Sequence, residues 1–517
     1  MKKNKTPKKT KPRPTKDLPP KKKHTGVPGG DGKTVQIQSK GRLTKILSEK
    51  YRNEKKSLPA KPSSHSAPKD TGTLMVSVSG IRGIIGESLT PEVITKYAAA
   101  FGTWCNGGTI VVGRDSRVSG EMVKTLVTGT LLAAGCKIVD IGIVPTPTVE
   151  ITVNDMNAHG GIAITASHNP IQWNALKLIG PRGRFLTQSQ MNEVLEIADR
   201  KSTLLATWDR IGKINYYDHA IQNHIDHILE LEYIDVESLR KRNFKVVVDC
   251  VNGAGGVIVP RLLKELGCNV VVINEEPHGV FPRNPEPSVD NLKALEETVR
   301  QHHAHIGFAV DPDVDRLALV NEKGQAIGEE LTLMIATDLV LSRKKGPVVV
   351  NASTTMGIDQ IASMYGVQTH HTRIGEINVS TKMEEIDSVI GGEGNGGVIL
   401  PEIHLGRDAC TGIALALQYV LQKNKPFSEC VAELPYFIMK KDKIELHDID
   451  ADAVMTKILK DQKKGRVDTV DGVKIIFEDG WIHFRKSNTE PIMRIIAEAR
   501  TQERLDNMIQ SFTSYFH

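Results

Sequence analysis

Residues 311–316, with the sequence Asp-Pro-Asp-Val-Asp-Arg, carry three carboxylates between two apolar runs, Ile306–Val310 and Leu317–Val320. Their alternation predicts that all three point to one side, as a group of hard oxygen donors that suits Mg²⁺. Three ionised aspartates this close repel one another strongly unless a cation lies among them. A calcium-binding EF-hand is excluded, because its sixth position needs glycine and here holds Arg316. The predicted metal ligands are Asp311, Asp313 and Asp315, and a solvated acidic turn is the alternative.

Residues 165–170, Thr-Ala-Ser-His-Asn-Pro, follow the apolar run Gly161–Ile164. A serine after small residues, followed by polar groups and a proline, predicts a tight turn that exposes the Ser167 hydroxyl and nearby backbone N–H groups. A Ser-His hydrolase pair is disfavoured, because neighbouring residues on an extended turn seldom face each other and no Gly-x-Ser-x-Gly motif surrounds the serine. An Asn-Pro turn with an incidental serine is the alternative.

Residues 391–397, Gly-Gly-Glu-Gly-Asn-Gly-Gly, formally match the dinucleotide-binding fingerprint. That fingerprint must open a helix, and here the apolar residues Val398–Leu400 and then Pro401 follow, so a Rossmann site is rejected. Glycines around one glutamate and one asparagine suit a loop that a polyol can approach closely. The alternative is a plain flexible turn.

Residues 485–491, Arg-Lys-Ser-Asn-Thr-Glu-Pro, combine two cations, two hydroxyls and an amide. Together with successive backbone N–H groups, these side chains can form a concave anion site of the kind that binds phosphate. Arginine can bind two phosphate oxygens at once, which lysine cannot. A charged turn without a ligand is the alternative.

The elements that must position these loops recur as one unit. Each copy has an apolar strand, a small-residue loop, a helix, a glycine and a second apolar strand, which indicates a βαβ unit buried on both faces of a mostly parallel sheet. The expected strand pairs are Thr109–Val112 with Lys137–Ile143, Phe244–Val248 with Val270–Ile273, and Pro347–Val350 with Val367–His371. The C-terminal section differs and predicts a small α+β domain, with strands Val473–Phe477, Trp481–Phe484 and Met493–Ala499 and a helix from Gln502.

Composition restricts the class of protein. The chain has 517 residues, of which 39% are hydrophobic, enough for several domains of ordinary globular type. No stretch approaches the roughly 18 uncharged apolar residues that a membrane span needs. Six scattered cysteines without a Cys-x-x-Cys pair indicate buried thiols in a reducing compartment. We therefore expect a cytoplasmic protein.

The charge is distributed unevenly along the chain. Residues 1–70 hold 21 of the 67 Lys and Arg and 5 of the 61 Asp and Glu, a net charge of +16, which leaves −10 for the rest. This segment has too little apolar surface to offset the entropy of ordering, so we expect a disordered basic tail. The acidic remainder is not a nucleic-acid binder, and only a weak contact of the tail with nucleic acid stays open.

Taken together, the four loops resemble those of the α-D-phosphohexomutase superfamily, which includes phosphoglucomutase, phosphomannomutase and phosphoglucosamine mutase. The resemblance runs from about Thr71 to the C-terminus and includes Ser79-Gly80-Ile81-Arg82-Gly83. It implies three related α/β/α domains with mixed, largely parallel sheets and a smaller C-terminal α+β domain, around a central cleft. The expected boundaries are 71–213 for the phosphoserine domain, 214–326 for the metal-binding domain, 327–436 for the sugar-binding domain and 437–517 for the phosphate-binding domain.

The resemblance also implies a role for each matching residue. Ser167 would be the phosphoserine, and Mg²⁺ would be held against it by Asp311, Asp313 and Asp315. Lys177 would be the general base, although Ala175 stands where the family motif has glycine. His168 would position the serine loop, and Arg316 would lie beside the phosphoserine. The expected substrate-binding residues are Arg82, Glu393, Asn395, Arg485, Ser487, Asn488 and Thr489.

The implied activity is the interconversion of a hexose 6-phosphate and 1-phosphate through a 1,6-bisphosphate, with a glucose- or glucosamine-1,6-bisphosphate as activator. Many relatives read Gly-Glu-x-Ser-Gly-His in the sugar loop, whereas residues 392–397 have asparagine for the serine and lack the histidine. This form, with Pro401-Glu402 and Gly406-Arg407-Asp408 after it, resembles the phosphoglucosamine mutase-like branch. Glucosamine 6-phosphate is the expected substrate. Phosphomannomutase or phosphoglucomutase activity and an inactive sugar-phosphate-binding protein are the alternatives. We expect a monomer or homodimer.

The basic tail yields a first prediction. Removal of residues 1–70 should leave the turnover number and the Mg²⁺ dependence nearly unchanged, because the tail has little apolar surface with which to dock on the remainder. Steady-state assays of the full and shortened chains measure this. A large loss of turnover in a shortened protein that remains folded would contradict the prediction.

Overall fold

The computed structural model describes residues 73–446, 450–461, 464–486, 492–513 and 515. The expected basic tail, residues 1–70, and the predicted phosphate ligands Ser487, Asn488 and Thr489 lie outside these described residues. Within the described part of the chain, none of the helices is both long and apolar enough to cross a membrane.

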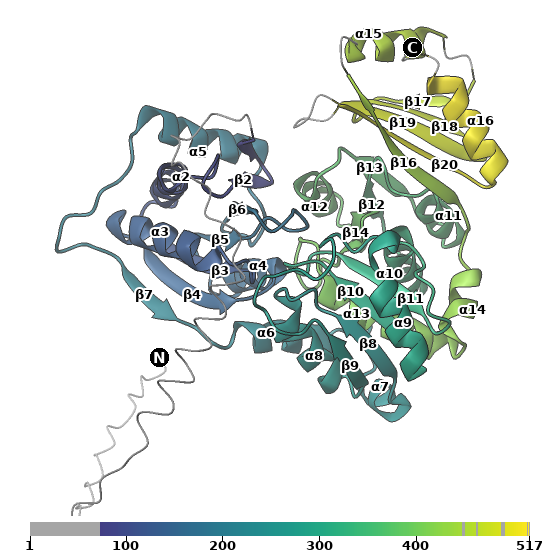
Figure 1. Ribbon diagram of the computed structural model, residues 1–517, viewed down its shortest axis with the longest axis horizontal. Helices are drawn as coiled ribbons and strands as arrows, with labels where there is room; N and C mark the ends of the chain where they lie inside the picture. The colour runs from purple at the N-terminus through teal and green to yellow at the C-terminus, as the bar shows by residue number, and fades with distance from the viewer. Residues whose placement is uncertain (1–72, 447–449, 462–463, 487–491, 514, 516–517) are drawn as a thin grey trace, which may run out of the picture. The chain divides into compact units, whose positions relative to one another are not determined.

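The first domain is built on a seven-stranded mixed sheet with the order β1-β2-β6-β5-β3-β4-β7 (Figure 1). β5, β3, β4 and β7 are parallel neighbours, and β1, β2 and β6 pair antiparallel. The strands are β1 (Met75–Ser77), β2 (Gly80–Ile84), β3 (Thr109–Arg114), β4 (Lys137–Ile143), β5 (Gly160–Ile164), β6 (Trp173–Ile179) and β7 (Lys213–Tyr216). The helices are α2 (Pro91–Trp104), α3 (Gly120–Ala133), α4 (Thr146–Asp155) and α5 (Gln188–Arg200).

The second domain has a four-stranded sheet with the order β11-β10-β8-β9. β10, β8 and β9 are parallel, and β11 pairs antiparallel with β10. The strands are β8 (Lys245–Asp249), β9 (Asn269–Ile273), β10 (Ile306–Val310) and β11 (Leu317–Asn321). The helices are α6 (Ala220–Leu229), α7 (Val236–Arg242), α8 (Gly255–Glu265) and α9 (Lys293–His302), with a 3₁₀ turn at Val289–Asn291.

The third domain repeats this arrangement in the order β13-β12-β14-β15, with only the last pair antiparallel. The strands are β12 (Val348–Asn351), β13 (Thr369–Thr372), β14 (Ile390–Glu393) and β15 (Gly397–Ile399). The helices are α10 (Glu329–Arg343), α11 (Gly357–Met364), α12 (Glu376–Glu385), α13 (Ala409–Lys423) and α14 (Phe427–Ala432).

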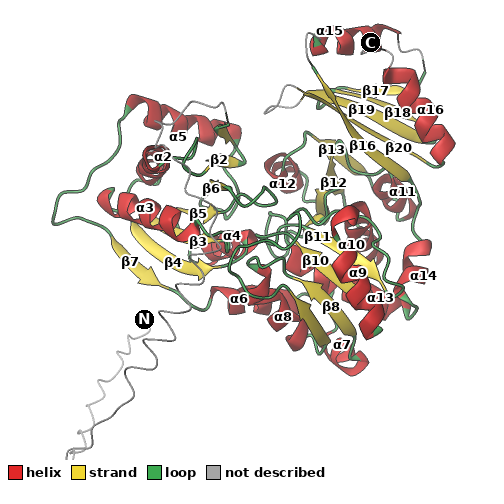
Figure 2. Cartoon of the chain, viewed as in Figure 1, coloured by secondary structure: helices red, strands yellow, loops and turns green. Residues whose placement is uncertain are grey.

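The C-terminal domain is different, because its five strands are all antiparallel, in the order β16-β20-β19-β18-β17. Its strands are β16 (Ile438–Glu445), β17 (Arg466–Asp468), β18 (Val473–Phe477), β19 (Gly480–Lys486) and β20 (Ile492–Ala499). Two helices, α15 (Ala451–Asp461) and α16 (Gln502–Thr513), complete it (Figure 2).

One strand in each of the first three domains shows why these sheets lie between two layers of helices. Successive valines of β8 enter different hydrophobic cores: Val246 and Val248 join one core, and Val247 joins another. β12 does the same with Val348 and Val350 against Val349, as does β3 with Val111 against its neighbours Ile110 and Val112. Because adjacent side chains of a strand point to opposite faces, both faces of each sheet are buried. The expected fold, three α/β/α domains and a smaller α+β domain, is therefore confirmed. The central cleft and the domain boundaries stay predictions.

Candidate active site

The serine loop follows β5 and has a strained backbone. Ser167 has φ = +49°, in the left-handed region that residues other than glycine seldom occupy. Its N–H donates to Thr165 Oγ1 at 3.0 Å, and the Thr165 hydroxyl donates to Asp115 Oδ2 at 2.6 Å. This chain of hydrogen bonds fixes the backbone at Ser167, and Thr165, Ser167 and Asp115 are all buried.

Arg117, which the sequence interpretation did not include, binds the same loop. Its buried guanidinium pairs with Asp115, with Nε 3.0 Å from Oδ2. Its Nη atoms donate to four loop carbonyls, at 2.6–3.0 Å, those of Ser167, Asn169, Pro170 and Trp173. The only signal in the sequence was its position in the loop after the first predicted strand.

The three aspartates converge in a turn between β10 and β11. One carboxylate oxygen from each of Asp311, Asp313 and Asp315 lies within 4.8 Å of the others, and all three residues are buried. The predicted convergence is present, but extended alternation is not its cause: the segment is a turn in which Val314 has φ = +61°.

This triad lies directly against the serine. Ser167 Oγ donates to Asp311 Oδ2 at 2.8 Å. Oδ1 of Asp313 and Oδ1 of Asp315 are buried and have no hydrogen-bond partner among the described residues, although Arg316 Nε lies 3.8 Å from Asp315 Oδ1. Buried carboxylate oxygens without donors are costly unless a cation is bound, so the donor set fits a hard divalent cation such as Mg²⁺.

Lys177 on β6 supplies positive charge to the triad. Its Nζ lies 2.7 Å from Asp313 Oδ2 and 3.3 Å from Asp315 Oδ2. Burial alone would lower the pKa of Lys177, but Asp313 and Asp315 raise it above its usual value. Burial would likewise raise the pKa of Asp315, but Arg407, Lys177 and Arg316 hold it well below its usual range. Burial and the two neighbouring aspartates raise the pKa of Asp311. Lys177 is therefore protonated in this arrangement.

His168 and Arg316 meet at Glu286, which the sequence interpretation did not include. Arg316 Nη1 donates to both carboxylate oxygens of Glu286 at 2.6 Å, and His168 Nε2 lies 3.5 Å from Oε2. Contrary to the expectation that serine and histidine do not face each other, His168 Nδ1 lies 3.3 Å from Ser167 Oγ. Burial and Arg316 hold the pKa of His168 well below its usual value, so the imidazole is neutral.

Arg82 on β2 also reaches the serine loop. Its Nη1 donates to Asn169 Oδ1 at 2.6 Å. Burial lowers the pKa of Arg82 to about 10, so the side chain stays charged at neutral pH. The predicted residue thus brings a cation to the loop that carries Ser167.

The sugar-loop residues lie at the end of β14. Glu393 is buried, and its Oε1 accepts from Asn351 Nδ2 and from the N–H of Gly375, both at 2.9 Å. Its Oε2 accepts from Arg407 Nη1 at 2.7 Å. Asn395 Oδ1 accepts the N–H of Gly397 at 3.2 Å, which leaves its amide nitrogen as the group it can offer to a ligand.

Arg485, at the end of β19, is the one residue of the predicted phosphate set that the structure describes. Its Nε lies 3.0 Å from Asp471 Oδ2. Asp471 also accepts the backbone N–H of Ile374 in the third domain at 3.0 Å. Arg485 thus pairs with an aspartate that links two domains, and the residues brought together around Ser167 come from the first three.

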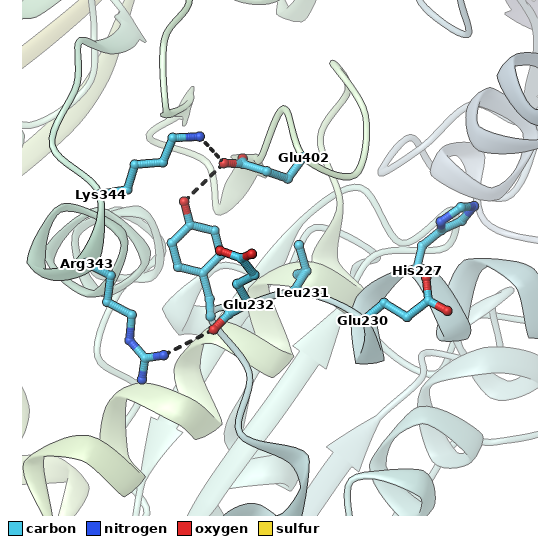
Figure 3. Close-up of a pocket in the computed structure, with 8 residues that line it drawn as sticks. His227, Glu230, Leu231, Glu232, Arg343, Lys344 and Glu402 are labelled. Carbon is cyan, nitrogen blue, oxygen red and sulfur yellow. Dashed lines mark hydrogen bonds and ion pairs between the residues drawn. The ribbon is translucent and has the colours of Figure 1, made fainter.

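A separate pocket of about 670 Å³ contains none of the predicted residues (Figure 3). Two of its residues share one acceptor: Lys344 and Tyr233 both donate to Glu402 Oε1, at 2.6 and 3.1 Å. Burial and Glu402 raise the pKa of Tyr233, so its hydroxyl stays protonated.

The chain matches family models over four successive segments. Three are described as phosphoglucomutase/phosphomannomutase alpha/beta/alpha domains I, II and III, at residues 74–204, 222–324 and 328–437. The fourth is described as the C-terminal domain of the same family, at residues 442–513.

Curated relatives and solved structures match most of the chain. A "Phosphoglucomutase/phosphomannomutase" of Thermococcus kodakarensis is 41% identical over 434 residues, 82% of this chain and 94% of that protein. A "Probable phosphoglucosamine mutase" of Methanopyrus kandleri is 36% identical over 438 residues, 84% and 96% of the two chains. The crystal structure of a phosphoglucomutase/phosphomannomutase family protein from Burkholderia thailandensis superposes with a TM-score of 0.75 at 27% identity, covering 85% of this chain and 97% of that one.

The ion pair and hydrogen bonds of Arg117 predict that replacing this residue destabilises the protein. Arg117→Met should lower the free energy of unfolding by about 3–5 kcal/mol, because Asp115 keeps a buried charge without its partner. The four loop carbonyls also lose their donor. Thermal and urea unfolding measure the effect.

Arg343→Met is the matched control, since Arg343 donates only to Gln422 and to the Glu232 carbonyl, at 3.3 Å, on the exposed surface. Its effect should stay within about 0.5 kcal/mol. Equal stability losses in the two variants would show that Arg117 has no special role in the loop.

Proposed function

The chain belongs to the phosphoglucomutase/phosphomannomutase family of isomerases, and we propose that it interconverts a hexose 6-phosphate and 1-phosphate through a phosphoserine at Ser167. The observation that carries this proposal is the 2.8 Å hydrogen bond between Ser167 Oγ and Asp311 within the buried triad. A serine oxygen held against a cation site is suited to carry a phosphoryl group, since phosphoryl transfer depends on placement and charge neutralisation.

Mg²⁺ is the proposed cofactor, with Asp311, Asp313 and Asp315 as the residues that would hold it. When bound, it would neutralise the phosphoryl oxygens of a phosphoserine, which carries about −1.5 to −2 charge at pH 7. The unpartnered oxygens of Asp313 and Asp315 support this assignment.

Lys177 is the proposed general base for the sugar hydroxyl that attacks the phosphoserine. Its Nζ is buried beside the triad, close to the serine loop. Because Asp313 and Asp315 raise its pKa here, Lys177 can accept a proton only when these contacts loosen. It would then return the proton to the leaving oxygen in the reverse transfer.

His168 and Arg316 are proposed to position the serine and the phosphoryl oxygens. The neutral His168 imidazole lies 3.3 Å from Ser167 Oγ and limits its rotation. Arg316 is held by Glu286 at 2.6 Å and keeps its charge beside the triad. Both side chains would thus orient the phosphoryl group, and neither would accept the proton of the sugar hydroxyl.

Substrate binding is assigned to groups from several domains. Glu393 and Asn395 would bind sugar hydroxyls, and Arg82 would contact the reacting phosphate near Asn169. Arg485, with Ser487, Asn488 and Thr489, would bind the other phosphate. After the first transfer the 1,6-bisphosphate must turn over so that its second phosphate reaches Ser167, and a glucose- or glucosamine-1,6-bisphosphate would act as the activator.

Glucosamine 6-phosphate is the proposed substrate. The Gly-Glu-Gly-Asn-Gly-Gly form of residues 392–397 supports it, and relatives from several archaea at 34–36% identity carry the name "Probable phosphoglucosamine mutase". Glucose or mannose phosphate is the second candidate, because the relative at 41% identity carries the name "Phosphoglucomutase/phosphomannomutase". The Asn395 amide nitrogen can donate to a hydroxyl or to an uncharged amine.

Replacement of the serine tests the mechanism. Ser167→Ala should lose its phosphate and at least about 10³-fold of kcat, because no group remains to carry the phosphoryl. Mass spectrometry of the intact protein and a coupled mutase assay measure the two losses. The matched control is Ser342→Ala, which removes a hydroxyl that donates to the Leu339 carbonyl at 2.6 Å and accepts from Gln422 Nε2 at 3.4 Å. Retained turnover in Ser167→Ala would remove this serine from the mechanism, whereas a wild-type chain without phosphate or turnover would indicate an inactive sugar-phosphate-binding protein.

A panel of three substrates tests the sugar. The 6-phosphates of glucosamine, glucose and mannose should differ in kcat/KM, with glucosamine 6-phosphate highest by about tenfold or more, as expected for one recognised polar group. The assay follows formation of each 1-phosphate under equal Mg²⁺ and activator. A higher kcat/KM for glucose or mannose 6-phosphate would favour the second candidate.

A further inference from the structure

Arg407 joins three buried carboxylates that belong to different elements. Its Nη1 lies 2.7 Å from Glu393 Oε2 in the sugar loop, and its Nη2 lies 2.7 Å from Asp315 Oδ2 in the triad. Its Nε lies 2.9 Å from Glu376 Oε2 at the start of α12. All four side chains are less than a tenth exposed. One guanidinium thus connects the residue assigned to the sugar with a residue assigned to the metal.

The glycine at position 397 is what makes room for this arginine. A Cβ at Gly397 would lie 2.2 Å from Arg407 Cδ and 2.9 Å from Cγ, so the Arg407 side chain would have to move to admit it. Position 397 is where the related loop Gly-Glu-x-Ser-Gly-His has its histidine. The Cγ and Cδ atoms of Arg407 therefore occupy the space that a side chain at position 397 would need. This placement brings the Arg407 guanidinium next to Glu393.

We propose that Arg407 is a positioning residue that orients Glu393 for the sugar and withholds Asp315 from the metal, so that its removal changes sugar and metal affinity in opposite directions. The proposal rests on the proposed function, because it takes Glu393 as a sugar ligand and Asp315 as a metal ligand. The proposal adds Arg407 as a residue that acts on both Glu393 and Asp315 through one side chain.

The opposite changes in sugar affinity and metal affinity follow from charge and geometry. Without the arginine, Glu393 loses one of its three donors and its fixed orientation, which weakens sugar binding. Asp315 at the same time loses the Arg407 cation, 2.7 Å from its Oδ2, whose positive charge repels a metal ion bound at this carboxylate. Asp315 then binds a divalent cation more tightly. A purely structural arginine would instead weaken both kinds of binding as the site loses order.

Four variants of the full chain separate these cases. Arg407→Met removes the charge. Arg407→Lys keeps the charge but cannot bind all three carboxylates at once. Gly397→Ala displaces the arginine without changing any charge. Arg184→Met is the matched control, because Arg184 also pairs with a glutamate of α12, Glu384, at 2.9 Å and is mostly buried. Titration calorimetry with Mn²⁺ alone measures metal affinity, and steady-state kinetics measure KM and kcat for the hexose 6-phosphate that wild type turns over best.

In Arg407→Met we expect KM for the hexose phosphate to rise at least about tenfold, as for the loss of a charged hydrogen bond. The dissociation constant for Mn²⁺ should fall about three- to tenfold, as for the loss of a nearby repulsive charge. Arg407→Lys should raise KM with Mn²⁺ affinity near wild type, Gly397→Ala should raise KM, and Arg184→Met should change neither.

Weaker Mn²⁺ binding in Arg407→Met, or a wild-type KM in both Arg407→Met and Gly397→Ala, would overturn the proposal. The proposed function fails separately, if the wild-type chain binds Mn²⁺ but converts no hexose phosphate. In that case the Mn²⁺ titrations of wild type and Arg407→Met still decide whether Arg407 withholds Asp315 from a cation.

Discussion

The burial of negative charge is the constraint on which the rest of the site depends. Five carboxylates lie close together and out of solvent, from Asp311, Asp313, Asp315, Glu376 and Glu393. Ionised carboxylates without partners would cost several kcal/mol each in such a place. Lys177, Arg316 and Arg407 supply the opposing charge, and the unpartnered oxygens of the triad leave room for one more cation. Removal of any one of these cations therefore leaves a buried carboxylate without its full compensating charge.

This charge balance also connects the domains. Lys177 belongs to the first domain, the triad to the second and Arg407 to the third, so the Lys177–Asp313 and Arg407–Asp315 salt bridges both cross a domain border. The backbone of the metal turn is held in the same way. The N–H of Thr146 in the first domain donates to the Asp313 carbonyl at 2.9 Å, and the N–H of Ala409 in the third donates to the Val314 carbonyl at 3.1 Å. The triad is therefore positioned by its neighbours as much as by its own strands.

The functional loops share one structural origin. The serine loop follows β5, the metal turn follows β10, and Glu393 ends β14, and each of these strands runs parallel to a neighbour in its sheet. Ligand sites of α/β domains lie beyond the carboxyl ends of such strands, where loops are free to carry polar groups. The left-handed backbone at Ser167 is stabilised by two hydrogen bonds, one from Arg117 to the Ser167 carbonyl and one from the Ser167 N–H to Thr165 Oγ1. Local strain at the serine is thus balanced by buried bonds outside it.

The sequence alone indicated many of the strands, the succession of three βαβ units and a different C-terminal section, and the candidate site residues, whose roles stay predictions. Apolar runs such as Lys137–Ile143 and Val473–Phe477 match β4 and β18 to the residue, because burial on a sheet imposes a local pattern. The aspartate triad was also evident, because its three carboxylates lie within five residues. Arg117, Glu286 and Arg407 were not evident as site residues. Each acts on partners that are distant in the chain, Arg407 on Asp315 across 92 residues and Arg316 on Glu286 across 30. Only the tertiary structure decided these contacts, because the pairing of a buried charge depends on which distant side chains packing brings within about 3 Å.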